Sequence, residues 1–111
     1  MATLSSHLLN SVNGTHAGGV KVIIYQINSS GNKTIFFETE TDDGGRIIKD
    51  FELSSDDCAC EYEMVCKTAD YFSEKKVVSE IIIKFKMEDP KKKYHLPIII
   101  SPNGYSIWWS N

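Results

Sequence analysis

The side chains of this sequence that could do chemistry include three cysteines, Cys58, Cys60 and Cys66. Their spacing lacks the paired C-x-x-C motif that is typical of a tetrahedral zinc site. If a strand begins at Cys60, then Cys60, Tyr62, Met64 and Cys66 share one face of it, and the cysteines serve as small buried hydrophobic residues. We favour this interpretation over a metal site. The odd number of cysteines also argues against a secreted disulfide framework and predicts a reduced, cytoplasmic protein.

The charge of the chain argues against two classes of partner. Fifteen acidic and twelve basic residues give a net charge of −3, which provides no general attraction for nucleic acids or anionic membranes. The only basic run, residues 91–93, follows an acidic pair and a proline, so we interpret it as a solvated turn. No apolar run reaches the roughly 20 residues that span a bilayer. We therefore expect neither a nucleic-acid partner nor a membrane partner.

Short apolar segments separated by turn residues predict an all-β fold in a single domain of 111 residues, 1–111. No segment shows sustained helical periodicity, and residues 68–76 are expected to hold a helical turn at most. Strands at this spacing are typical of a sandwich or a small barrel. The eight expected strands are residues 4–10, 20–27, 33–41, 46–53, 60–67, 77–87, 94–101 and 105–109.

Two stretches of the sequence resemble the 5-hydroxyisourate hydrolase and transthyretin family. LSSHLLNSVNGTHAGGVKVIIYQI, from Leu4, is similar to the family opening Leu-x-x-His-Val-Leu-Asp, with its Gly-x-Pro-Ala turn, Gly-Val and apolar strand. KYHLPIIISPNGYS, which ends at Ser106, is similar to the family's Tyr-His-Val-Pro-Leu-Leu-Leu-Ser-Pro-x-Gly-Tyr-Ser. Between them, TDDGGRI resembles a family turn that ends in Gly-Arg, and ADYF with SEIIIKF resembles the late-strand region. The resemblance thus covers nearly the whole chain in order.

This resemblance implies both an architecture and an activity. The architecture is a transthyretin-like (prealbumin-like) sandwich of two four-stranded sheets with little or no helix, assembled as a homotetramer with its sites in channels at the dimer–dimer interface. The activity is hydrolysis of 5-hydroxyisourate, a planar cyclic ureide produced by urate oxidation. A cyclic amide C–N bond opens in this reaction, and neither a metal nor an organic cofactor is needed.

The resemblance also implies catalytic roles for three residues. His7 matches the family's first catalytic histidine and would hold or activate water, whereas His95 matches the second and would assist that water or protonate the leaving nitrogen. Arg46 matches the arginine that binds the carbonyl-rich ring and stabilises developing charge. Each residue alone also has a plain structural interpretation, as a packed histidine or a solvated turn arginine, but three matches together favour catalysis. His16 falls where the family has a turn proline, so we expect a surface residue.

The last four residues depart from the family pattern. The hydrolases end in Tyr-Arg-Gly-Ser or Thr-Arg-Gly-Ser, which lines the active site, whereas this chain ends in Trp108-Trp109-Ser110-Asn111. In a strand the two indoles point to opposite faces. Trp109, in the place of the arginine, could therefore stack on the substrate, or both tryptophans could extend an interface or the core. The expected substrate-binding residues are Ser106, Trp108 and Trp109.

Two other classes of function stay open because of this altered ending. Transthyretin also lacks the tetrapeptide and is a carrier. The chain could therefore be a diverged tetramer that binds an aromatic small molecule, or one that acts on a different cyclic substrate. The third possibility is a scaffold whose outer surface is the useful one.

Overall fold

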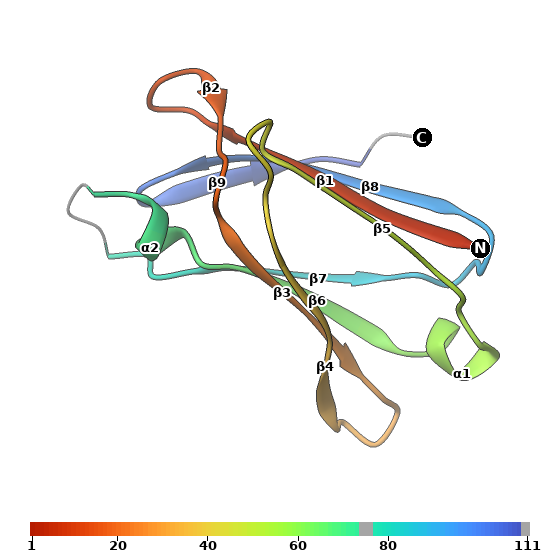
Figure 1. The fold of residues 1–111 in the computed structure, drawn as a ribbon. Coiled ribbons are helices and arrows are strands. Elements are labelled where there is room, and N and C mark those ends of the chain that lie inside the picture. Colours follow the sequence, from red (N-terminus) through yellow and green to blue (C-terminus); the bar gives the residue numbers. More distant parts are fainter. Residues whose placement is uncertain (74–76, 110–111) are drawn as a thin grey trace.

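The computed structural model describes residues 1–73 and 77–109, which form two β-sheets packed face to face (Figure 1). The first sheet consists of four antiparallel strands, in the order β4 (Lys33–Glu40), β3 (Lys21–Ile27), β6 (Glu61–Cys66) and β7 (Ile81–Lys86). The predicted all-β sandwich is therefore confirmed. No helix among the described residues is long and apolar enough to cross a membrane.

The second sheet carries the residues of interest. Its order is β2 (Thr15–His16), β1 (Ala2–Asn10), β8 (Lys93–Ser101) and β9 (Gly104–Ile107), with β5 (Arg46–Phe51) also paired to β1. β1 and β8 run parallel and side by side across this layer, whereas β5 and β2 pair with successive parts of the other edge of β1 (Figure 1). The two helices are single turns, α1 (Ser55–Cys58) and α2 (Thr68–Tyr71).

β1 shows how the sequence pattern fixes this sheet. Its even-numbered residues, such as Leu4 and Leu8, are buried against the other sheet, and its odd-numbered residues, such as His7, face outward. This alternation is the two-residue period of a strand with one buried face. β8 repeats the pattern, with Ile98 and Ile100 fully buried. The core face of the sheet is thus apolar, and the outer face is left for polar residues.

The facing strand β6 confirms the expected burial of Cys66. Tyr62, Met64 and Cys66 are all 0% exposed on the core face. Burial raises the pKa of the Cys66 thiol to about 12, so the thiol is neutral at physiological pH and packs as a hydrophobic group. Cys58 and Cys60 are half-buried and form no disulfide.

The observed secondary structure differs from the predicted one at several places. The second sheet has five strands rather than four, because a hairpin adds the two-residue β2 beside β1. The predicted strand 77–87 begins only at Ile81: the N–H groups of Val77 and Val78 donate instead to Asn103 Oδ1, at 2.6 and 3.2 Å. α1 was not predicted, although Ser54 and Asp57 form a capping box at its start. In the predicted turn 68–76, α2 covers 68–71, and residues 74–76 lie outside the described residues.

Gly45 attaches the turn before β5 to β1. Its carbonyl accepts a hydrogen bond from Leu8 N–H at 2.7 Å, and its φ is +73°, in the left-handed region that favours glycine. A Cβ at this position would lie only 2.4 Å from the carbonyl oxygen of Leu8. Only glycine therefore allows the close approach that places Arg46 beside β1.

We expect Gly45→Ala to lower the free energy of unfolding by at least about 2 kcal/mol, because it combines backbone strain with a backbone clash. Gly44→Ala is the matched control, since its Cβ would meet only Asp42 Oδ1 at 3.4 Å. Urea denaturation at a fixed protein concentration, followed by tryptophan fluorescence, measures both losses. Equal losses for the two variants would contradict this role of Gly45.

Candidate active site

Strand pairing brings three predicted site residues to the outer face of the second sheet. His7 on β1 lies opposite Arg46 on β5 and opposite Pro97 on β8. His95 lies opposite Ser5, one outward-facing position before His7 along β1. Paired residues in a sheet share a face, and diagonal neighbours are about 7–8 Å apart between Cα atoms, within reach of long side chains. His7, Arg46 and His95 thus form one cluster, which we call the histidine face.

His95 is oriented by a hydrogen bond across this face. Its Nδ1 lies 2.8 Å from Ser5 Oγ, and both side chains are partly buried. The contact fixes the ring and leaves Nε2 as the nitrogen that can meet a ligand. Sequence analysis did not assign Ser5 a role, although its place two residues before His7 puts both on the same face of a strand.

His7 makes a contact that sequence analysis missed. Its Nε2 lies 2.9 Å from Nδ1 of His16, and the two rings are 5.0 Å apart between centroids, with an interplanar angle of 30°. His16 is exposed, as predicted, but it lies opposite Leu9, and therefore on the histidine face. Gly14 was the feature of the sequence that could have predicted this contact, since a turn at Gly14 folds the chain back on β1.

The electrostatics of the histidine face favour an uncharged His7. Partial burial lowers the pKa of His7 below its ordinary value of 6.5, and the nearby Arg46, His16 and His95 lower it further. Both effects penalise the imidazolium form, the first by loss of hydration and the second by repulsion between like charges. At neutral pH, His7 can therefore hold a lone pair that accepts a proton.

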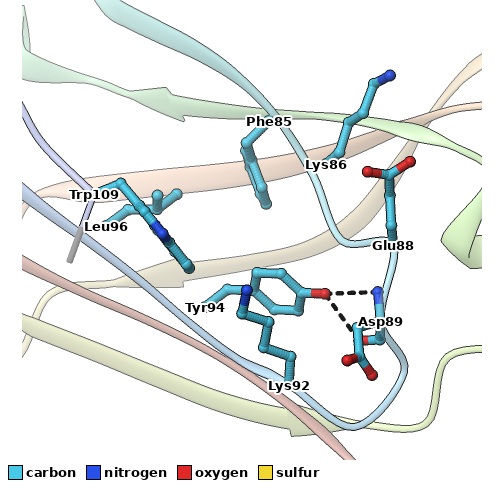
Figure 2. Close-up of a pocket in the computed structure, with 8 residues that line it drawn as sticks. All are labelled: Phe85, Lys86, Glu88, Asp89, Lys92, Tyr94, Leu96 and Trp109. Atoms are coloured by element: carbon cyan, nitrogen blue, oxygen red, sulfur yellow. Dashed lines mark hydrogen bonds between the residues drawn. The ribbon is translucent and has the colours of Figure 1, made fainter. Parts of the chain in front are cut away.

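The predicted substrate-binding residues are only partly brought to this face. Ser106 lies opposite Ile99, so it shares the outer face. Trp109 lies apart from it, in a pocket of about 330 Å³ that includes neither His7, Arg46 nor His95. This aromatic pocket is lined by Phe85, Lys86, Glu88, Asp89, Lys92, Tyr94, Leu96 and Trp109 (Figure 2).

Tyr94 contacts two other residues that line the aromatic pocket, Asp89 and Trp109. Its hydroxyl accepts a hydrogen bond from Asp89 N–H at 2.8 Å and donates to the Asp89 carbonyl at 2.9 Å (Figure 2). The Trp109 ring lies 6.2 Å from the Tyr94 ring, and Lys92 Nζ lies 5.3 Å from the centroid of a Trp109 ring. Trp109 therefore packs against its own chain instead of reaching the histidine face.

The predicted opposite placement of the two tryptophans is not observed. β9 ends at Ile107, so strand alternation does not continue through residues 108 and 109. Trp108 and Trp109 instead line one hollow with Ile83, Phe85 and Ile107. Both indoles are nearly half exposed, at 46% and 44%. Ser110 and Asn111, the last two positions of the altered ending, lie outside the described residues.

Comparison with known proteins decides the family. The HIUase/Transthyretin family profile matches residues 4–109, nearly the entire chain. This protein belongs to the HIUase/transthyretin family. Relatives named 5-hydroxyisourate hydrolase share 25 to 32% identity with it. The relative from Halalkalibacterium halodurans is 27% identical over 112 residues, which covers 95% of this chain and 94% of that protein.

Solved structures of family members have the same fold. The 5-hydroxyisourate hydrolase of Klebsiella pneumoniae superposes with a TM-score of 0.77 at 25% identity, over 100% of both chains. Transthyretin from Sparus aurata superposes with a TM-score of 0.79 at 22% identity, covering 96% of this chain and 95% of that one. The family therefore includes both a hydrolase and a transthyretin on this sandwich.

We expect the pKa of His7 to lie below 6.5 and to rise when Arg46 is changed to Gln, because the imidazolium then has one fewer positive neighbour. NMR titration of ¹⁵N-histidine-labelled protein measures both values. Lys49→Gln is the matched control, since it removes a charge from β5 at a side chain that lies over Phe37. A rise in the pKa of His7 in Lys49→Gln as large as that in Arg46→Gln would contradict the effect assigned to Arg46.

Proposed function

We propose that this protein hydrolyses 5-hydroxyisourate, or a closely related planar cyclic ureide, at a ring C–N bond. The observation that carries the proposal is the histidine face itself. His7, Arg46 and His95 come from three strands and meet on one outward surface. The names of the relatives at 25 to 32% identity support the same reaction class.

In the proposed mechanism each group has a separate task. Arg46 binds the carbonyl oxygens of the ring and stabilises negative charge on the attacked carbonyl. A neutral imidazole at the His7 end of the face takes a proton from water, whose oxygen attacks the carbonyl carbon. His95, oriented by Ser5, lies where a proton is delivered to the leaving nitrogen as the C–N bond breaks. The net reaction adds one water, with no covalent enzyme intermediate.

We further propose a homotetramer in the cytoplasm. A histidine face open on one side cannot enclose a small ring, and a second copy packed over it would form the missing wall. Exposed apolar side chains beside the face support this assembly: Ile48, opposite Ser5, is 75% exposed, and Val12 in the β1–β2 turn is 57% exposed. The reduced state of the three cysteines is compatible with the cytoplasm.

A second candidate function is binding of an aromatic small molecule without turnover. The aromatic pocket favours it, because Phe85, Tyr94 and Trp109 line a space of about 330 Å³. Pockets of this size are typical of small-ligand sites. The absence of the family's C-terminal arginine points in the same direction.

We expect this protein to accelerate decay of 5-hydroxyisourate, and we expect His7→Ala or His95→Ala to lower kcat/KM by about 10²-fold or more, since His7 belongs to the imidazole pair that accepts the water proton and His95 delivers the proton to the leaving nitrogen. Stopped-flow ultraviolet absorbance, with urate oxidase generating the substrate in place, measures the decay. Thr34→Ala, an exposed change on β4 of the other sheet, is the control and should leave the rate unchanged.

Decay at the spontaneous rate with the wild-type protein would contradict the hydrolase proposal. The second candidate would then be tested by titrating aromatic acids while tryptophan fluorescence is followed in Trp109→Leu and Trp108→Leu. A ligand of the aromatic pocket should lose affinity mainly in the Trp109 variant.

We expect multi-angle light scattering to report four subunits at micromolar concentration, because burial of Ile48 and its neighbours stabilises association. Ile48→Asp should shift the protein towards smaller species, since it would place a charge in the buried interface. The exposed Ile35 on β4 provides the matched control, Ile35→Asp, with no change in mass expected. A wild-type monomer would contradict the assembly.

A further inference from the structure

We propose that His16 is the water-facing base of the histidine face and that His7 is the residue that orients it. The inference rests on the proposed hydrolytic function and names the atom that accepts the proton. It begins from the close contact between the two rings, 2.9 Å between His7 Nε2 and His16 Nδ1. One of these two nitrogens must donate and the other must accept.

The surroundings of His7 determine which nitrogen donates. A hydrogen bond with the backbone of Gly44 raises the pKa of His7, the effect expected when the imidazole donates its N–H to a carbonyl. Nε2 faces His16, so the nitrogen that donates to Gly44 is Nδ1. In the neutral ring, Nε2 therefore carries the lone pair and accepts from His16 Nδ1–H.

This arrangement leaves one free lone pair in the neutral pair, on Nε2 of His16. That nitrogen makes no hydrogen bond with the described residues, and the side chain is exposed, whereas His7 is partly buried. The lone pair of His7 is already occupied by the N–H of His16. Water that approaches this end of the face thus meets a free base on His16 rather than on His7.

The β1–β2 hairpin holds His16 in this position. Gly14, at φ +71°, donates its N–H to the Asn10 carbonyl at 2.9 Å and closes the turn. Immediately after His16, Ala17 is fully buried, and its N–H donates to the Leu8 carbonyl at 2.9 Å. His16 is therefore fixed on both sides by backbone contacts to β1.

The proton balance of the step is simple. The water oxygen forms a C–O bond to the attacked carbonyl carbon, and one water proton moves to His16 Nε2. The charge that results on His16 is shared through its Nδ1–H with His7 Nε2. When the C–N bond breaks, His95 gives one proton to the leaving nitrogen, and the proton held by the His7–His16 pair replaces it on His95, so both return to neutral and the net change is the addition of one water.

The pH dependence of this step depends on the groups around His16. His7 on β1, Arg46 on β5 and His95 on β8 share its face, and Arg46 and His95 oppose positive charge on the His7 ring of the pair. Asp42 and Asp43 lie in the turn before β5, where Asp42 Oδ1 accepts hydrogen bonds from the N–H groups of Gly44 and Arg46, both at 2.9 Å. Because the neutral pair is the active form, turnover should rise with pH and then reach a plateau.

His16→Asn tests the assignment, because the asparagine amide can donate in place of Nδ1–H but offers no basic nitrogen. We expect kcat/KM to fall about 10²-fold while His7 keeps its Nδ1–H tautomer. Thr15→Ala, an exposed neighbour on β2, should retain wild-type turnover and pH profile. Long-range ¹H–¹⁵N NMR of histidine-labelled protein identifies the tautomers and the pKa of each ring.

The results separate this inference from the hydrolase proposal. Wild-type turnover with an unchanged pH profile in His16→Asn would overturn the role of His16, although the hydrolase proposal would stand. A His7 ring with its proton on Nε2 in the wild type would also overturn it. If the wild type has no hydrolase activity, the proposed function and the base assignment both fail.

Discussion

The register between β1 and its two neighbours is the constraint on which the site depends. Parallel pairing with β8 sets Ser5 opposite His95, and antiparallel pairing with β5 sets His7 opposite Arg46. Because side chains alternate between faces, a slip of one residue would turn His7 into the core and expose Leu8. Burial of Leu4 and Leu8 therefore stabilises the fold and fixes the orientation of His7 at the same time.

The same constraint explains why the site lies on an outward face of the sheet. A sheet whose core face is filled mainly by apolar residues presents its polar chemistry on its outer face, away from the core of the sandwich. Partial burial and the neighbouring Arg46, His16 and His95 lower the pKa of His7 there, which favours its neutral form. The proposed assembly completes the site by supplying a second surface, so that activity and association are linked through one face of the sheet.

Strand alternation and turn residues are local signals, so they predicted the all-β class and most of the strands, whereas the sandwich of two sheets was implied by the family resemblance. Sequence reasoning placed His7, Arg46 and His95 through their match to family motifs, and their gathering on one face follows from strand register. It missed the contact between His7 and His16 because that contact depends on how far the hairpin after Asn10 folds back. It left the role of the tryptophans open, and the opposite placement expected for a strand does not apply because β9 ends at Ile107, where alternation no longer determines direction. The predicted strand 77–87 begins late because the N–H groups of Val77 and Val78 donate to Asn103 Oδ1 instead of to a neighbouring strand.

The central claim is that the histidine face, and not the aromatic pocket, binds the planar ring. The most direct measurement is NMR of protein labelled with ¹⁵N in histidine and tryptophan side chains, titrated with urate as a stable planar analogue. Binding at the histidine face would shift the imidazole signals of His7 and His95 and leave the indole signal of Trp109 in place. Shifts confined to the indole of Trp109, with unchanged imidazole signals, would contradict the claim.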